Sequence, residues 1–437
     1  MLKPVFEFEK YNDGVMVKKF LEGPEIVEVP GEFEGQKVVA IGPECFRENG
    51  IMVTEIILPD TVKELMSDAF SYTVSLEKLH LPEGLEKIGA DHLLASGLSE
   101  SYIPGSVEHI ERPELMDRSF KVSPDNKKYF SDGYGLYERN GDDIRLVAVN
   151  VSEPRESYDI KEGTKEIALN TFRDAAAVGC LYIPESLTDI KEGSLSYNGG
   201  VVNDEKGIKS VKVSENNPKF TLVSNMLCER QDDGSLKVIR FFGGNKAVVP
   251  DDVSVIGFEG FKNTGVEELY IPESVKQINA GAFSGCPVNV CHIGDTLFGF
   301  GDEDRFTKES FLECFGKKGK IYDFDVLDNF LLEQYLTPGR IRMICTRLKY
   351  PLDLTEEKRT GFVGRIENEL YKGVEMLSET KDIQTIEAMG ELGFFTDDNI
   401  DEIIEMMGKG DKKELTAWFM SYKNRSLKSK GGFDFML

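Results

Sequence analysis

The sequence is short of the residues that stabilise small extracellular scaffolds or build metal centres. Its 437 residues include seven cysteines, four histidines and one tryptophan. The cysteine count is odd and the cysteines are widely scattered, which does not fit a disulfide framework. We therefore expect reduced thiols at Cys45, Cys180, Cys228, Cys286, Cys291, Cys314 and Cys345.

Long apolar runs are missing too. Residues Met1 to Glu9 contain no stretch resembling a signal-peptide core. No segment reaches the roughly 18 apolar residues of a membrane-spanning helix. Together with reduced cysteines, these absences predict a cytoplasmic protein that does not bind membranes. A cell-surface or secreted location is the alternative if a leader has been removed.

Positive charge is in the minority. The chain has 77 acidic and 52 basic side chains, and its formal net charge is −25. An anionic surface repels nucleic-acid phosphates and anionic lipid headgroups. We therefore expect no nucleic-acid partner.

Motifs that carry chemistry are absent as well. The chain contains no Walker A sequence, no His-Glu-x-x-His and no Gly-x-Ser-x-Gly. The densest group of possible metal ligands is Cys286, Cys291 and His292, which lacks a Cys-x2-Cys pair and an evident fourth ligand. We interpret these cysteines as buried core or cap residues. The sequence predicts a protein that is not an enzyme and has no cofactor or metal.

What the sequence does contain is an internal repeat marked by proline. Each marker proline is followed by an aliphatic residue three and six positions later, and by Phe or Leu eleven positions later. The markers are Pro59, Pro82, Pro104, Pro184, Pro250 and Pro272. Their shortest spacings are 22 and 23 residues. A fixed short period is the signature of stacked repeat coils.

The residues before each proline predict a strand. Leu79-His80-Leu81 alternates between buried and outward positions, and the proline ends the strand because it has no N–H group. One coil cannot cover its own apolar face, so neighbouring coils must stack. The strands then form a parallel sheet on one side of a curved solenoid, with the Phe or Leu buried on the opposite wall.

A longer duplication interrupts the array. Phe120-Lys121-Val122-Ser123 matches Val211-Lys212-Val213-Ser214, an offset of 91 residues. Each copy is followed by a turn signal between alternating apolar residues, Asn140-Gly141 in one and Asp233-Gly234 in the other. Both signals predict β-hairpin insertions.

These units resemble BspA-like (Treponema pallidum-type) leucine-rich repeats, with their L-x-x-L-x-[LI]-P-x-x-[LV]-x-x-I-x-x-x-x-F pattern. The resemblance covers roughly residues 25–290, and Val29 to Gly42 look like that family's first coil. It implies a leucine-rich-repeat parallel β solenoid of bacterial type. Many family members are surface-exposed and act in adhesion or protein binding, whereas we expect this chain to lack an export signal.

Beyond the repeats the apolar period becomes helical. Leu415, Trp418, Phe419 and Tyr422 are spaced at i, i+3, i+4 and i+7, which predicts a small all-α domain of helical hairpins. The last residues resemble the ankyrin-like helical tail of some intracellular Firmicutes repeat proteins. The expected organisation is an N-terminal β cap at 1–24, the solenoid at 25–290, a linker or cap at 291–303 and the α-helical domain at 304–437.

The candidate binding surface follows from the strand alternation. Residues two and four positions before each proline point away from the core, onto the concave face of the solenoid. The candidate partner-binding residues are Glu55, Ile57, Lys78, His80, Glu100, Tyr102, Tyr182, Glu268 and Tyr270. Tyrosine combines a rigid apolar ring with a hydroxyl group and suits interfaces. The alternative is that these side chains only stack on one another across the strands.

The sequence therefore predicts a non-enzymatic module that binds a protein or peptide partner on the concave sheet. The alternative function is an exported adhesin or glycan-binding protein. A third hypothesis, an enzyme within residues 304–437, requires a deep pocket with converging titratable groups. We expect a monomer.

Overall fold

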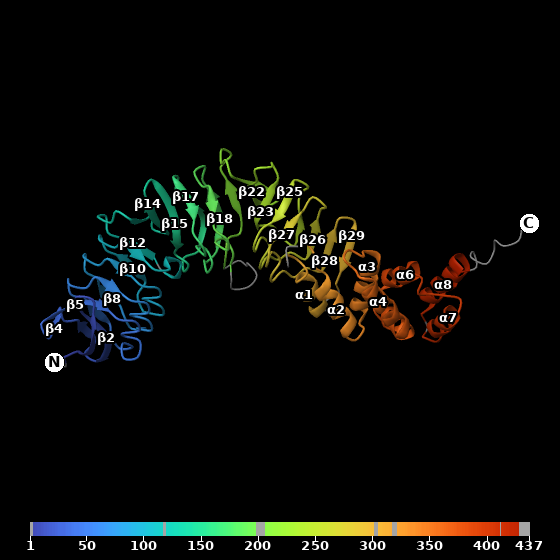
Figure 1. Ribbon diagram of the computed structural model, residues 1–437, viewed down its shortest axis with the longest axis horizontal. Coiled ribbons are helices and arrows are strands. Elements are labelled where there is room, and N and C mark those ends of the chain that lie inside the picture. The colour runs from blue at the N-terminus through green and yellow to red at the C-terminus, as the bar shows by residue number, and fades with distance from the viewer. Residues whose placement is uncertain are drawn as a thin grey trace, which may run out of the picture. The chain divides into compact units, whose positions relative to one another are not determined.

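The computed structural model describes residues 3–116, 119–197, 206–300, 305–316, 321–410 and 412–427. The chain forms two compact units, Met1–Arg230 and Gln231–Leu437, called unit 1 and unit 2 below. In each unit the strands follow one another in chain order (Figure 1). The border between the units lies inside the segment 25–290 that the repeat pattern assigns to one solenoid. The predicted border at 303–304 lies outside the described residues.

Unit 1 begins with a β-hairpin. Strands β1 (Val5–Tyr11) and β2 (Gly14–Glu22) pair in antiparallel fashion, and Tyr11 lies opposite Gly14. Strand β2 pairs in parallel with β5 (Gln36–Ile41), which pairs in turn with the short β4 (Glu32–Phe33). The hairpin therefore covers the edge of a repeat sheet.

The strands that precede the prolines form parallel sheets, which we call the pre-proline sheets. In unit 1 they pair in the orders β3-β6-β8, β10-β12 and β16-β18-β20. Their bounds are β3 (Ile26–Glu28), β6 (Glu55–Ile57), β8 (Lys78–His80), β10 (Glu100–Ile103), β12 (Ser119–Val122), β16 (Arg155–Asp159), β18 (Val178–Ile183) and β20 (Val211–Val213). The predicted parallel pairing is confirmed.

Each coil also has a second strand after the proline, which the repeat pattern did not predict. In unit 1 these strands continue β5 as β7-β9-β11, and further along they pair as β15-β17-β19. Their bounds are β7 (Glu64–Leu65), β9 (Lys87–Ile88), β11 (His109–Ile110), β15 (Asp143–Val149), β17 (Thr164–Ile167) and β19 (Asp189–Ile190). Most are two residues long, too short for an alternation of side chains to be visible in sequence.

The residue eleven positions after each proline fills the opposite wall. Phe70, Phe261 and Phe283 are buried. Ring centroids of successive coils lie 5.4 Å apart between Phe46 and Phe70, and 5.2 Å apart between Phe261 and Phe283. Leu93 and Leu195 are also buried. Leu115 is only half-buried, because it belongs to a single 3₁₀ turn, Pro113–Leu115.

The first predicted hairpin insertion is confirmed. Strand β14 (Gly135–Asn140) pairs with β13 (Tyr129–Ser131) and with β15, and Asn140 lies opposite Asp143 across a two-residue turn. The equivalent segment of the second copy begins with the hairpin β21 (Phe220–Val223) and β22 (Met226–Arg230). In unit 2 the turn around Gly234 is closed by a 2.9 Å hydrogen bond from the N–H of Gln231 to the carbonyl oxygen of Ser235.

Unit 2 continues the same coil with two sheets, ordered β24-β26-β28-β29 and β23-β25-β27. The strands are β23 (Leu236–Phe241), β24 (Lys246–Val248), β25 (Val253–Ile256), β26 (Glu268–Ile271), β27 (Gln277–Ile278), β28 (Val290–Ile293) and β29 (Thr296–Gly299). The antiparallel pair β28–β29 lies largely within the segment predicted as a linker or cap.

The rest of unit 2 is helical, as predicted. Its α-helices are α1 (Arg305–Leu312), α2 (Asp325–Glu333), α3 (Pro338–Lys349), α4 (Glu356–Asn368), α5 (Leu370–Glu379), α6 (Ile383–Glu391), α7 (Ile400–Lys409) and α8 (Lys413–Tyr422). Helix α3 packs on β29, and a buried ion pair joins Arg347 to Asp328 at 2.7 Å. None of the described helices combines the length and apolar character needed to cross a membrane.

Candidate partner-binding faces of the pre-proline sheets

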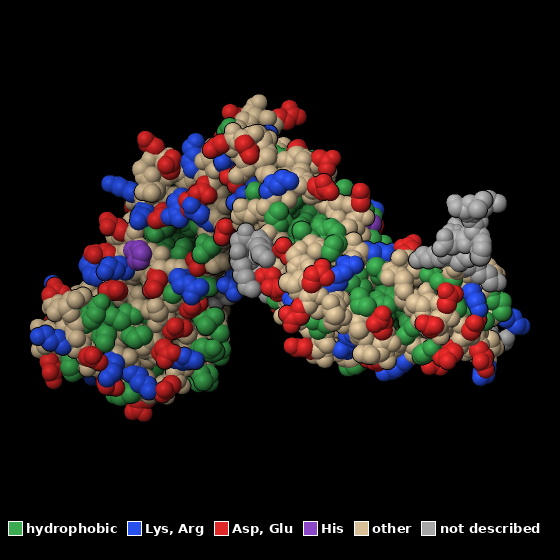
Figure 2. Space-filling view, turned by 45° about the vertical axis from the view of Figure 1, so that its right-hand side comes forward, with side chains coloured by type: hydrophobic (Ala, Val, Ile, Leu, Met, Phe, Trp, Pro, Cys, Tyr) green, Lys and Arg blue, Asp and Glu red, His purple; other side chains and the backbone are tan. Residues whose placement is uncertain are grey.

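All nine candidate residues lie on pre-proline strands, where alternate side chains enter the core. Ile56, Leu181 and Leu269 point inward and are fully buried, so the candidates beside them lie on the opposite face of the sheet. Seven candidates belong to unit 1, and Glu268 and Tyr270 belong to unit 2. On the visible face of the molecule, acidic and basic side chains alternate with small hydrophobic patches (Figure 2).

Strands β6 and β8 bring four candidates together. Glu55 lies opposite Lys78, and Ile57 lies opposite His80. The Nε2 atom of His80 is 2.7 Å from Oε1 of Glu55, and Nζ of Lys78 is 3.9 Å from Oε2 of the same carboxylate. Exposed ion pairs of this kind add little stability. They do hold the charged groups beside the apolar Ile57.

Glu100 and Tyr102 lie on β10, where Tyr102 is tied to a neighbouring coil. Its hydroxyl donates a hydrogen bond to Glu83, whose second oxygen accepts the N–H of Gly105 at 2.9 Å. The hydrogen bond from Tyr102 is the main cause of a lowered pKa of Glu83, and burial is the main cause of a raised pKa of Tyr102. The tyrosine therefore presents its ring rather than a free hydroxyl.

Strand alternation does not identify Glu83, because this residue follows the proline. A second regularity of the sequence does, since five of the six marker prolines are followed directly by an acidic residue. These are Asp60, Glu83, Glu185, Asp251 and Glu273.

Tyr182 on β18 is the most available of the three tyrosines. It is 37% exposed. Asp159 and Lys212 lie opposite it on the two neighbouring strands. Among the residues that the structure describes, its hydroxyl has no hydrogen-bond partner. This position therefore offers an unused donor between two opposite charges.

In unit 2 four side chains form one row across the sheet. Val248 pairs with Tyr270, Tyr270 with His292, and His292 with Leu297. Val248 is 50% exposed and Leu297 is 47% exposed. The inward row beneath them is Ala247, Leu269, Cys291 and Phe298, all buried. We call Val248, Tyr270, His292 and Leu297 the unit 2 row.

Tyr270 is sandwiched within this row. Its ring stacks on His292 with centroids 4.1 Å apart and planes 6° apart. The ammonium group of Lys246 lies 4.6 Å from the ring centroid and 3.2 Å from the carboxylate of Glu268. Glu268 also accepts the hydroxyl of Tyr270, and this hydrogen bond is the main cause of its lowered pKa. The alternative that these side chains only stack on one another thus describes Tyr270 and His292, but the exposed apolar side chains of Val248 and Leu297 remain on either side.

Of the unit 2 row, only Tyr270 was among the candidates. Val248 stands two residues before Pro250, so the same rule that selected the others identifies it. His292 and Leu297 follow the last marker proline, and only the pairing of β26, β28 and β29 places them in the row.

The cysteines of the possible metal group point into the core. Cys286 and Cys291 are buried, whereas His292 lies on the outer face of the same strand as Cys291. Burial raises the pKa of the Cys286 thiol to about 11 and also raises that of Cys291. All seven cysteines are free. Within the described part of the chain, no group of His, Cys, Asp or Glu is arranged to hold a metal ion.

The sequence of the repeats matches a known family. Residues 35–119 and 244–316 match the BspA type leucine rich repeat region, in six copies. These segments are leucine-rich repeats of the BspA type, followed by a helical C-terminal region, as the sequence predicts. The unmatched residues between the two segments contain the hairpins β13–β14 and β21–β22, which break the regular spacing of the coils. No curated protein matches the sequence.

Several solved bacterial leucine-rich-repeat structures are similar. A leucine rich cell surface protein from Faecalibacterium prausnitzii is 16% identical, with a TM-score of 0.37, over 67% of this chain and 94% of that chain. A leucine-rich repeat protein from Eubacterium ventriosum is 16% identical, with a TM-score of 0.36, over 66% and 93% of the two chains. The T. pallidum leucine-rich repeat protein is 17% identical, with a TM-score of 0.25, over 48% and 82%.

Proposed function

We propose that this chain is a non-enzymatic interaction module that binds a protein or peptide on its pre-proline sheets. Leucine-rich-repeat proteins are commonly protein-interaction or surface-associated modules, and this chain contains such repeats. The unit 2 row is the observation that supports binding on the pre-proline sheets. It presents exposed Val248 and Leu297 on either side of a stacked Tyr270 and His292.

The chemistry of the row favours a polypeptide partner. Burial of exposed apolar surface is worth about 25 cal/mol per Å², and Val248 and Leu297 each offer such surface. The ring of Tyr270 is already held by its neighbours, so its ordering on binding costs little conformational entropy. Lys246 and Glu268 are paired with each other, which leaves the row with no strong charge to select an ionic ligand.

In unit 1, Tyr182 supports the same role. Its ring and unused hydroxyl stand between Asp159 and Lys212. A peptide backbone supplies both donors and acceptors to such a group. Tyrosine with flanking charges is typical of protein interfaces, where aromatic anchors dominate the binding energy.

A cytoplasmic location is part of the proposal. It is supported by seven free cysteines, of which all but Cys180 are buried. Thiols of this kind persist in reducing compartments. Fractionation of the source cells tests the location, and recovery of the protein at the cell surface would support the adhesin alternative instead.

The binding proposal is tested by capture of partners from a lysate of the source cell, followed by mass spectrometry. The two units are tested separately, with Tyr102→Ala/Tyr182→Ala in unit 1 and Val248→Ser/Tyr270→Ala in unit 2. We expect a partner retained by the wild type to lose at least tenfold in affinity for one of these variants, measured with the purified pair by calorimetry.

Matched controls remove exposed tyrosines outside the sheets. Tyr72→Ala serves unit 1, where Tyr72 is 42% exposed, and Tyr335→Ala serves unit 2, where Tyr335 is 70% exposed. The controls should bind within twofold of the wild type. A partner that binds all four variants equally well would overturn the assignment to the pre-proline sheets.

A further inference from the structure

The first coil of unit 1 has three walls, and the N-terminal hairpin does not cover all of them. Strand β2 pairs with β5 and so continues the sheet of second strands. The ring of Phe20 stacks on that of Phe46, with centroids 5.1 Å apart, and so continues the phenylalanine stack. The third wall is the pre-proline sheet β3-β6-β8, and no strand among the described residues pairs with the outer side of β3. This edge of the sheet is therefore open.

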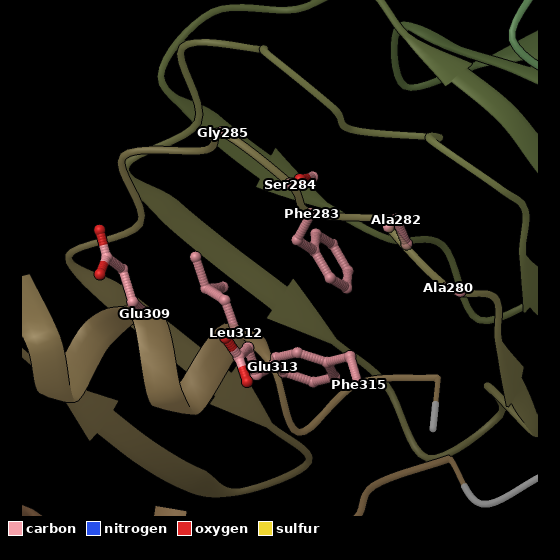
Figure 3. A pocket seen from close by; sticks show the side chains of 10 residues that line it. Ala280, Ala282, Phe283, Ser284, Gly285, Glu309, Leu312, Glu313 and Phe315 are labelled. Atoms are coloured by element: carbon pink, nitrogen blue, oxygen red, sulfur yellow. The ribbon is translucent and has the colours of Figure 1, made fainter. Parts of the chain in front are cut away.

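The last coil of unit 2 is covered on the corresponding wall. Its pre-proline strand β28 pairs with the antiparallel strand β29, and helix α3 packs on β29. Its phenylalanine stack is continued by Phe315, whose ring centroid lies 5.0 Å from that of Phe283 (Figure 3). A pre-proline sheet of this chain can thus end beneath an added strand, and β3 has none.

The backbone around β3 uses the hydrogen-bonding groups of one edge only. The N–H of Glu55 donates to the carbonyl of Glu25 at 3.2 Å, and the N–H of Val29 donates to a carbonyl of β6 at 2.9 Å. In a parallel pair, alternate residues turn their N–H and C=O groups toward the same neighbouring strand. The N–H and C=O groups of Ile26 and Glu28 therefore face away from β6, and they have no hydrogen-bond partner among the described residues.

The side chains at this edge are an exposed isoleucine and two unpaired carboxylates. Ile26 is 52% exposed, whereas Val27 beside it points into the core and is buried. Glu25 and Glu28 are exposed, and neither carboxylate has an ion pair or hydrogen bond within the described part of the chain. Glu28 stands two residues after Ile26, so both side chains lie on the same face of the sheet. The open edge thus offers apolar surface next to negative charge.

Two features limit what can pair with β3. The strand has three residues and lies between Pro24 and Pro30, and short length and flanking prolines guard an edge against unspecific pairing. An antiparallel pairing with β3 of a second copy would place the Glu28 side chains of the two copies opposite or diagonal to each other. Each copy also carries a net charge of −25. This repulsion favours a different strand with basic side chains.

We propose that the open edge of β3 binds an extended segment of a partner protein that carries an apolar residue and a lysine or arginine two positions apart. The segment adds a further strand to the pre-proline sheet, and its backbone exchanges hydrogen bonds with the N–H and C=O groups of Ile26 and Glu28. Its apolar side chain packs against Ile26, and its basic side chain lies opposite Glu28. The edge is distinct from the sheet faces discussed above, so this inference does not rest on the function proposed for them.

The test uses the full chain and a phage-displayed library of random seven-residue peptides, and the enriched peptides are synthesised for calorimetry. Ile26→Pro removes an outward N–H group that takes no part in the pairing with β6, and Ile26→Ser removes only the apolar side chain. Glu25→Gln/Glu28→Gln removes the negative charge. Glu108→Gln/Glu192→Gln, at exposed positions of unit 1, is the charge-matched control. Circular dichroism and thermal melting establish that each variant folds.

Methylation of single backbone nitrogens in an enriched peptide tests for the added strand directly. Such a strand turns every second N–H toward β3, so methylation should lower the affinity at alternate positions and leave it nearly unchanged between them. A uniform effect along the peptide contradicts the added strand.

We expect enrichment of peptides with an apolar and a basic residue two positions apart. They should lose at least tenfold in affinity for Ile26→Pro and for the Glu25/Glu28 variant, at least threefold for Ile26→Ser and less than twofold for the control. No enrichment, or wild-type affinity for both variants of Ile26, would overturn the site. A loss with the variants of Ile26 but none with the glutamine pair would overturn the basic-residue requirement.

Two further outcomes would assign the edge or the peptides differently. A wild-type dimer in analytical ultracentrifugation that becomes monomeric with Ile26→Pro would show that a second copy occupies the edge, against the proposal. Peptides that bind Ile26→Pro normally but lose affinity for Tyr102→Ala/Tyr182→Ala would bind the sheet face. That result would refute the edge site and leave the function proposed above intact.

Discussion

The two copies of the duplicated block share one buried clamp. In the first copy, Nδ2 of Asn126 donates to the carbonyl oxygens of Pro104 at 2.7 Å and Val107 at 3.1 Å. Its Oδ1 accepts the N–H groups of Lys128 at 2.9 Å and Tyr129 at 2.7 Å. One amide side chain thereby satisfies four backbone groups where the chain leaves the coil for the hairpin.

In the second copy Asn217 repeats the arrangement. Its Nδ2 donates to the carbonyls of Pro184 at 2.7 Å and Leu187 at 3.0 Å, and its Oδ1 accepts from Lys219 at 2.9 Å and Phe220 at 2.7 Å. Equivalent distances in the two copies differ by at most 0.1 Å. The clamp is therefore the same device used twice.

The filling around the clamp is not the same. In the first copy the hydroxyls of Tyr137 and Tyr158 lie 2.6 Å apart and share a hydrogen bond, and each oxygen lies 3.0 Å from Oδ2 of Asp132. In the second copy, Val223 and Cys228 occupy the positions of Asp132 and Tyr137. A buried polar network and an apolar filling therefore serve the same hairpin.

The comparison shows that backbone hydrogen bonds constrain the asparagine of the block more than the side chains around it. Orphaned buried backbone groups each cost about 1–3 kcal/mol, and only a side chain with both a donor and an acceptor at this point serves all four. Side-chain networks are replaceable by apolar groups of suitable volume at little net cost. We therefore expect the clamps to behave alike and the fillings to behave differently.

The largest expected effect is removal of a clamp. Asn126→Ala and Asn217→Ala should each lower the free energy of unfolding by at least about 4 kcal/mol, because four buried backbone groups lose their partners. Denaturant melting measures both. Asp125→Ala and Asn216→Ala, the exposed residues just before each clamp, should change stability by less than about 0.5 kcal/mol. A clamp variant that melts like its exposed control contradicts the shared role.

The coil, the second strand and the turns could be predicted from the sequence to different degrees, because each depends on a different physical signal. The coil was predicted because apolar residues such as Ile56 and Phe70 stand at fixed distances from a proline. The second strand at Glu64–Leu65 was not, since two residues show no alternation. The turns were missed because their left-handed positions, such as Asp68 with φ of 61° and Tyr72 with φ of 62°, are not glycine.

The candidate surface shows the same division. Strand alternation sufficed to place the ring of Tyr182 outside the core. The contacts of the other two tyrosines come from other coils, and strand alternation does not predict them. Tyr102 donates a hydrogen bond to Glu83, and Tyr270 stacks on His292. In the helical region, Asp328 of α2 and Arg347 of α3 form a buried ion pair. No local sequence pattern predicts this pair, because its two residues lie on different helices.

The second prediction uses alkaline pH to separate the copies. Burial raises the pKa of Tyr129 and of Tyr134 to about 12, and it also raises those of Tyr137 and Tyr158. The unfolded tyrosine titrates near pH 10. The folded state thus holds these protons more tightly, and the stability they support is present below about pH 10 and is lost as the pH rises through about 12.

The second copy has no tyrosine at the positions equivalent to Tyr129, Tyr134 and Tyr137, which hold Phe220, Asn225 and Cys228. Tyr129→Phe/Tyr134→Phe should therefore flatten the fall in unfolding free energy between about pH 9 and pH 11.5. Urea melting across this range is the measurement, and Tyr335→Phe, at an exposed site, is the control. An unchanged slope in the double variant would show that the alkaline sensitivity arises elsewhere.

A smaller effect is expected from the shared hydroxyl of the first copy. Tyr137→Phe should cost about 1–2 kcal/mol, because Tyr158 loses one partner and the N–H of Lys161, 3.2 Å from the Tyr137 hydroxyl, loses its acceptor. Equilibrium denaturation measures the loss. Tyr182→Phe provides the matched control on an exposed ring, with an expected change below about 0.5 kcal/mol. Equal values for the two variants would mean that the network contributes nothing to stability.

The smallest expected effect has the opposite sign. The hydroxyl of Tyr134 is buried and has no hydrogen-bond partner among the described residues, and the guanidinium carbon of Arg155 lies 4.5 Å from its ring centroid. Tyr134→Phe keeps the ring and its cation contact but removes an unsatisfied polar group, so it should raise the free energy of unfolding by about 1 kcal/mol. The same chemical change thus destabilises at Tyr137 and stabilises at Tyr134, two buried rings of one hairpin. A loss of stability at both positions, measured by denaturant melting, would show that Tyr134 has a partner such as a buried water. Both tyrosine hydroxyls of the first copy would then contribute to stability, whereas the second copy has Asn225 and Cys228 at the equivalent positions.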